Sequence, residues 1–199
     1  MSAHQTRDAI AIARRAYDHA IRLGHRHYGA EHFLLALAGA DEPAGAVLRE
    51  FGVTPERVEA GIARVGLLGD LDRDALAGIG IDVDAVYERA ASAFGREAIA
   101  RAATATVRRE PVWSRRSPRR RAGASRHGVF LPHDDGGLQG IGNARRESES
   151  RPAPLIDVED LALGFLAVTE GPLPTILAEL GVSAPALSAA IADRYRQVS

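Results

Sequence analysis

Apolar residues recur every three or four positions along the first part of the chain, the spacing typical of helices with one buried face. After Thr6, small apolar residues stand at positions 9, 13, 16 and 20, so they form one stripe on a helix of 3.6 residues per turn. Thr6 is suited to cap that helix, and Gly24 to end it in the left-handed conformation. Three further helices are predicted over residues 31–38, 43–51 and 54–65.

The same order of features occurs a second time near the end of the chain. The stretch from Glu31 to Val53 matches the stretch from Glu159 to Val182 with one inserted residue. Both contain a glutamate, an apolar run, a break with proline and a final Gly-Val, and both continue into a helix with proline in its first turn. Such an internal repeat predicts two similar structural units. We name residues 1–66 copy one and residues 129–199 copy two.

The fold class follows from the periodicity. No window alternates apolar and polar residues as a β-strand does, so we predict an all-α, pseudo-twofold fold of two four-helix repeats. Connecting helices are expected over residues 67–107 and an arginine-rich flexible loop over residues 108–128. Copy two is predicted to be degenerate with a frayed first helix, because each glycine in a helix interior costs up to about 1 kcal/mol. The glycines concerned are Gly136, Gly137, Gly140 and Gly142.

Composition excludes several functional classes. The 25 basic residues are all arginine, which excludes catalysis by a Schiff-base lysine and phosphate-loop ATPase chemistry. The absence of cysteine excludes thiolate metal sites and favours a reducing cytoplasm, where we expect the protein. No apolar run approaches the roughly 20 residues that span a membrane. No set of catalytic side chains is evident either, so we predict neither ATP hydrolysis nor peptidase activity.

Positive charge is concentrated between Arg108 and Arg126, where eight arginines accompany one glutamate. Together with Trp113, these arginines could bind nucleic-acid phosphates and stack a base. Two other interpretations stay open, namely a solvated disordered insert and contact with the acidic remainder of the chain. The candidate nucleic-acid-binding residues are Arg115, Arg116, Arg119, Arg120 and Arg121.

Two motifs carry a resemblance to a known family. The stretch LGHRHYGAEHFLLALAG, followed by AGAVLREFGV, resembles the amino-terminal double repeat of the Clp chaperone ATPases, and FLPHDDGG is similar to the family's Leu-Pro-Phe opening. The resemblance covers about two thirds of the chain. It implies a non-catalytic protein-binding module of Clp-type proteolysis without a cofactor, whose partners are the Clp ATPase, its substrates or its adaptors. An adaptor, a decoy and a regulator are equally compatible with this resemblance.

The same resemblance implies a binding site at the start of one helix in each copy. In the family, the glutamate in this place helps to recognise arginine-phosphorylated proteins, and the matching residues here are Glu31 and Glu159. A carboxylate pairs with a guanidinium through two hydrogen bonds, and helix-start amides attract phosphate. Thr6 and His32 complete the predicted protein-binding residues. The alternative is that Glu31 only complements the helix dipole, worth about 0.3–1 kcal/mol.

Three histidines near the first helix junction raise the question of a metal. His25, His27 and His32 lack the spacing of a zinc site, so no metal is predicted. The resemblance implies that His25 and His32 are structural partners. It also implies that peptide-like ligands dock on a face with an aromatic residue after Leu-Pro, where this chain has His133.

Overall fold

The structure is a computed structural model that describes residues 4–68, 79–95, 98, 131–149 and 154–198. The loop predicted over residues 108–128, with its five candidate arginines, lies outside the described residues. The predicted boundaries of the two copies and their connection stay predictions.

Copy one forms four helices in the predicted order. They are α1 (Arg7–Arg22), α2 (Ala30–Ala38), α3 (Pro43–Glu50) and α4 (Pro55–Leu68). Thr6 caps α1, because its side-chain oxygen accepts the backbone N–H of Ala9 at 3.2 Å. Gly24 follows α1 with φ of 74°, a left-handed conformation that glycine adopts without strain. The four helix predictions for this copy are therefore confirmed.

Copy two repeats this arrangement. Its helices are α8 (Asp135–Ser148), α9 (Val158–Leu166), α10 (Pro172–Glu179) and α11 (Ala184–Val198), and α6 (Val83–Phe94) lies between the copies in sequence. The helices α3 and α10 both contain eight residues and begin with proline. The all-α, pseudo-twofold prediction is confirmed.

The prediction of a frayed first helix in copy two is wrong. All four glycines lie within α8, which runs without a break over 14 residues. A Cβ atom at residue 140 would overlap the ring of Phe165, and one at residue 164 would overlap the backbone of Ala144. Glycine at these positions lets α8 and α9 approach closely, so packing compensates for the low helix propensity.

Short strand pairs cross-connect the two copies. The strand β1 (His4–Gln5), before α1, pairs in parallel with β2 (Leu155–Ile156), before α9. In the reciprocal place, Tyr28 before α2 forms a parallel bridge with His133 before α8. Pairs of this length leave no alternating pattern, and the sequence did not predict them. As a result, the start of α2 lies next to the start of α8, and the start of α9 lies next to the start of α1.

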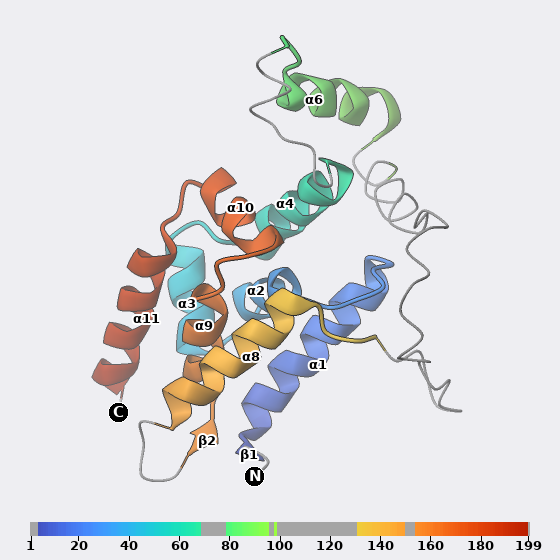
Figure 1. Cartoon of the computed structure of the whole chain (residues 1–199). Coiled ribbons are helices and arrows are strands. Elements are labelled where there is room, and N and C mark those ends of the chain that lie inside the picture. The colour runs from blue at the N-terminus through green and yellow to red at the C-terminus, as the bar shows by residue number, and fades with distance from the viewer. Residues whose placement is uncertain (1–3, 69–78, 96–97, 99–130, 150–153, 199) are drawn as a thin grey trace.

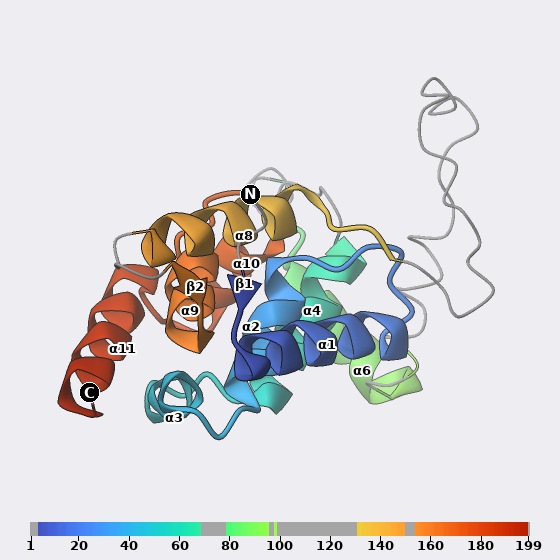
Figure 2. The ribbon, with the colours of Figure 1, turned by 90° about the horizontal axis from the view of Figure 1, so that it is seen from below.

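The helices α2 and α9 form the centre of the bundle. Figure 1 shows the bundle with α6 set apart at one end, and Figure 2 shows α9 beneath α8 and α2 next to α1. Phe33 of α2 and Phe165 of α9 stack with ring centroids 3.9 Å apart. Side chains from both copies therefore share one hydrophobic core. The helix α6 contacts α4 through Tyr87, whose ring lies 5.2 Å from the Arg64 guanidinium.

Within the described residues, no single helix has the length and apolar composition to cross a membrane. The helices α10 and α11 reach that length and composition only as a pair, and they are bent by 88° relative to each other.

Candidate functional site

Glu31 occupies the first turn of α2, in an environment that is unusual for a carboxylate. Every residue of α2 is buried, and Glu31 is only 6% exposed. Gly29 precedes the helix as its N-cap residue and has no side chain that could cap it. The sequence therefore places an acid at a helix start, and the packing of α2 at the centre of the bundle buries it.

The side chain of His32, in the same helical turn, contacts the Glu31 carboxylate. Its Nδ1 atom lies 2.9 Å from Glu31 Oε1 and 3.1 Å from the backbone nitrogen of Gly29. A protonated Nδ1 donates to the carboxylate, whereas an unprotonated Nδ1 accepts the Gly29 N–H. The imidazole can satisfy only one of these two neighbours at a time. The proton on Nδ1 thus decides which of the two neighbours His32 satisfies.

Asp134 of copy two lies against the start of α2. The backbone N–H of Tyr28 donates to Pro132, and that of Asp134 donates to Tyr28, so the strand-like bridge holds the two segments together. A Cβ atom at residue 29 would overlap the Asp134 carboxylate, which explains why Gly29 has no side chain. We name Glu31, His32 and Asp134 the Glu31 site.

The surroundings shift the pKa values of the two carboxylates of the Glu31 site in opposite directions. Burial would raise the pKa of Glu31, but the hydrogen bond and charge of His32, the backbone N–H of Glu31 and the charge of His25 together outweigh it, so this pKa is lowered. Burial and the negative charge of Glu31 raise the pKa of Asp134. Among the described residues, no donor reaches the buried Glu31 Oε2 atom. A buried carboxylate oxygen without a donor is costly, so the site is suited to a positively charged hydrogen-bond donor.

His25 completes a hydrogen-bonded chain behind Glu31. Its Nδ1 atom lies 2.8 Å from His32 Nε2, and the two rings meet edge to face. This confirms that His25 and His32 are structural partners. Burial is the main cause that lowers the pKa of His25 to about 4.

The lowered pKa of His25 predicts a pH-dependent stability. Between pH 6.5 and about 4 the unfolded chain binds this proton and the folded chain does not, so stability falls as the pH falls through this range. We expect His25 to contribute a loss of about 2 kcal/mol between pH 7 and pH 4.5. In the His25→Gln variant, whose amide oxygen can still accept from His32, this part of the loss should vanish.

Urea unfolding at both pH values measures this effect. The exposed His27, changed to glutamine, serves as the matched control and should retain the wild-type pH dependence. A His25→Gln variant with the full wild-type loss would show that His25 is not the group responsible.

His25, Glu31 and His32 also form the group of described residues that could hold a metal ion, with ligand atoms within 4.8 Å of one another. The facing histidine nitrogens are 2.8 Å apart. Two nitrogen ligands of one zinc ion stand about 3.3 Å apart, given zinc–nitrogen bonds of about 2.0–2.1 Å and tetrahedral angles. The hydrogen-bonded pair would have to separate to admit an ion. The prediction that there is no metal stays a prediction.

The corresponding position in copy two is built differently. Glu159 is the second residue of α9, as Glu31 is of α2, but it is partly exposed. Asp157 and Asp160 cap the helix reciprocally, each accepting the backbone N–H of the other at 3.0 and 2.9 Å. Thr6 lies beside this helix start, because its N–H donates to Ile156 at 2.9 Å. We name Glu159, Asp157, Asp160 and Thr6 the Glu159 site.

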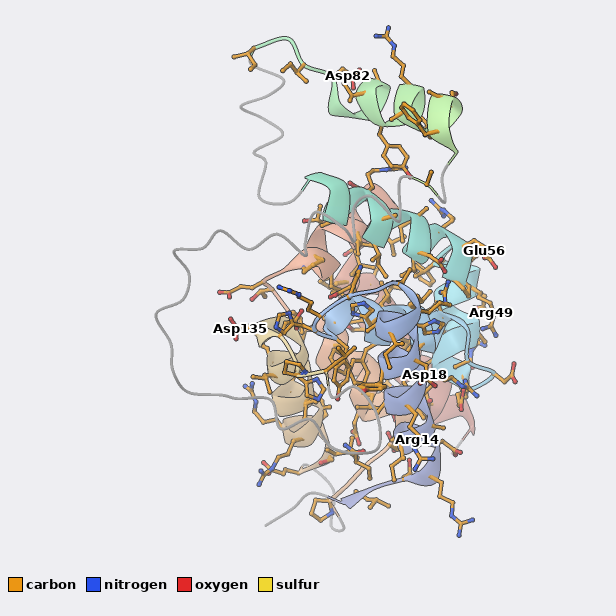
Figure 3. All side chains as sticks on the ribbon, turned by 90° about the vertical axis from the view of Figure 1, so that its right-hand side faces the viewer. Arg14, Asp18, Arg49, Glu56, Asp82 and Asp135 are labelled. Atoms are coloured by element: carbon orange, nitrogen blue, oxygen red, sulfur yellow. The ribbon has the colours of Figure 1, made fainter. Side chains whose placement is uncertain are left out.

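A groove of about 340 Å³ lies along α1 near the Glu31 site. Its lining is largely apolar and includes Leu131 and also Tyr28, which forms the bridge with His133 next to Asp134. Arg14 and Asp18 of α1 also line this groove and are labelled in Figure 3. His133, at the position where an aromatic residue was expected, is half-buried and its Nε2 atom lies 2.7 Å from the Tyr28 hydroxyl.

Comparison with solved structures identifies the architecture. The N-terminal domain of the caseinolytic protease associated chaperone ClpD from Arabidopsis thaliana superposes with a TM-score of 0.55 at 17% sequence identity. The match covers 97% of this chain and 95% of that domain. This chain has the Clp N-terminal domain fold. No family model matches the sequence, and no curated protein matches it.

Within the Clp N-domain fold, the structure regroups the predicted site residues. Glu31 and His32 are in contact, as sequence neighbours in one helical turn can be. Thr6, grouped with them by sequence, lies instead at the Glu159 site of the other copy. Asp134 caps α8 by accepting the Gly137 N–H at 2.7 Å. Its place against Gly29 depends on a contact 105 residues apart in sequence, for which the sequence contains no local signal.

Proposed function

We propose that this chain is a non-catalytic protein-binding module of Clp-type proteolysis, which binds arginine-bearing segments of substrates or adaptors at the Glu31 site. The Clp N-terminal domain fold supports the coarse part of this proposal. The observation that supports the finer part is the buried Oε2 atom of Glu31, which no donor among the described residues reaches. The guanidinium of arginine or phosphoarginine carries several N–H donors in one plane, which suits such a carboxylate.

The groove along α1 supports a peptide as the ligand. It shares Tyr28 with the bridge at the Glu31 site, and its lining offers apolar surface for residues next to the arginine. Binding of an extended segment would thus combine burial of apolar groups with one charge-assisted contact. The partner proteins proposed are a Clp ATPase, its substrates or its adaptors, in the cytoplasm.

A comparison of the two glutamates tests the proposal. We expect Glu31→Gln to weaken binding of an arginine-bearing or phosphoarginine-bearing peptide at least about tenfold, because an interaction with a buried charge contributes well over 1 kcal/mol. The matched change Glu159→Gln should alter the affinity less than about threefold, because the partly exposed Glu159 is screened by water.

Isothermal titration of the full chain measures both affinities, and circular dichroism checks that both variants fold. Equal losses in the two variants would mean that the Glu159 site binds as well as the Glu31 site. Unchanged affinity in both would return Glu31 to the role of a helix-dipole acid and overturn the proposal.

A further inference from the structure

We propose that Asp134 makes the Glu31 site specific for the unmodified arginine side chain, so that the site discriminates against phosphoarginine. This inference rests on the proposed function, since it names the ligand of the same site. It concerns the charge of the ligand: the guanidinium of arginine is a cation, whereas the phosphoryl group of phosphoarginine adds negative charge.

The first argument for this specificity is that the Glu31 site contains a second carboxylate, that of Asp134. Asp134 is the N-cap residue of α8, which is the place that Thr6 takes at α1. Both side chains accept the backbone N–H three residues further on. The cross-connection of the copies then puts the neutral hydroxyl of Thr6 beside α9 and the carboxylate of Asp134 beside α2. The Glu31 site thus has an acid where the other copy has a neutral capping residue.

The carboxylate of Asp134 lies within the field of Glu31. The charge of Glu31 contributes to the raised pKa of Asp134, as expected for two carboxylates that share one region. A cation between them relieves this repulsion, whereas a phosphoryl group adds to it. Specificity by repulsion of the wrong ligand is a general device of binding sites.

The second argument is the shortage of donors for a phosphate. Helix starts attract phosphate through backbone N–H groups that have no partner. Here the Gly137 N–H already donates to Asp134, the Gly29 N–H points to His32 Nδ1, and the His32 N–H donates to the Gly29 carbonyl. The amides of Gly137 and His32 therefore already have an acceptor within the protein, and the Gly29 N–H has one when His32 Nδ1 carries no proton.

The third argument is the unsatisfied acceptor. Glu31 Oε2 is buried, and no described group donates to it, although Glu31 Oε1 has His32 within 2.9 Å. A ligand with N–H groups can donate to this oxygen, whereas phosphate oxygens have no proton to donate. Of the two candidate ligands, unmodified arginine has the full guanidinium fork and positive charge to fill this place.

The test compares two peptides of identical sequence, one with a central arginine and one with a central phosphoarginine. Isothermal titration of the full wild-type chain should show at least about tenfold tighter binding of the arginine peptide. In the Asp134→Asn variant this preference should shrink at least about fivefold, because the arginine peptide loses an attractive charge and the phosphoarginine peptide loses a repulsive one. Asparagine caps helices as well as aspartate does, so α8 should persist.

Asp135→Asn is the matched control. It removes the same charge from the next residue, which is exposed and points away from the bundle (Figure 3), so the preference should change less than about twofold. Circular dichroism monitors folding, and Asp134→Ser, which also retains a capping oxygen, replaces Asp134→Asn if that variant melts early.

The outcomes separate this inference from the proposed function. If the phosphoarginine peptide binds wild type as tightly as the arginine peptide or more tightly, and Glu31→Gln abolishes that binding, the proposed function stands and this inference is overturned. An arginine preference that is unchanged in Asp134→Asn also overturns it. If neither peptide binds in a manner that depends on Glu31, the proposed function itself fails.

Discussion

Changing Phe33 to alanine is expected to lower the free energy of unfolding by about 3–5 kcal/mol, the range for truncating a buried phenylalanine. Phe33 is 1% exposed, and its ring stacks on that of Phe165 with an angle of 16° between the planes. The pair joins α2 of one copy to α9 of the other at the centre of the bundle. Its loss would leave a cavity between the copies, which the surrounding helices could fill only in part.

Urea unfolding followed by circular dichroism measures this loss. Phe94 of α6 provides the matched control, because its ring is 74% exposed and the same truncation should change stability by less than about 0.5 kcal/mol. A loss below about 1 kcal/mol for Phe33→Ala would contradict the shared core of the two copies.

Changing Gly140 or Gly142 of α8 to alanine should shift the free energy of unfolding in opposite directions. Gly140→Ala is expected to destabilise the protein by about 1–3 kcal/mol, because the new methyl group would overlap the ring of Phe165. That ring stacks on Phe33, so moving it aside would disturb the packing of the core. Gly142→Ala meets no atom within 4 Å and should stabilise the protein by up to about 1 kcal/mol, the difference in helix propensity.

A double-mutant cycle identifies the cause of the Gly140 effect. In a Phe165→Ala background, Gly140→Ala should cost much less, because the overlapping ring is gone. Destabilisation by both glycine changes in the wild-type background would mean that α8 requires glycine for a reason other than its contact with α9. Stabilisation by both would restore the view that these glycines only weaken the helix.

Helix positions were predictable because their signals are local. Thr6, the proline at the start of α3 and the glycine after α1 act within one or two helical turns, so the residues beside them decide the outcome. The internal repeat then predicted a second unit with the same order of helices, which α9, α10 and α11 confirm. The burial of α2 was also foreseeable, since its apolar run leaves no polar face.

The glycines of α8 show where local reasoning fails. Their low propensity predicts fraying, but propensity is a weak preference that a close helix contact can override. The contact involves Phe165 and Ala144, which belong to different helices, and no local pattern predicts how closely these helices approach. Gly142, which faces no such neighbour, has the same local sequence character as Gly140 but a different environment.

The candidate site was likewise predictable only in its local part. By itself the sequence determined that an acid and a histidine open α2 and that a further histidine lies seven residues before His32, because these residues are close in the chain. Only the tertiary structure decided that Asp134 joins Glu31 and that Thr6 joins Glu159. The reason is the exchange of short strand pairs between the copies, which brings together residues more than 100 positions apart. Backbone hydrogen bonds of this kind use groups that every residue has, so the sequence carries no mark of their partners.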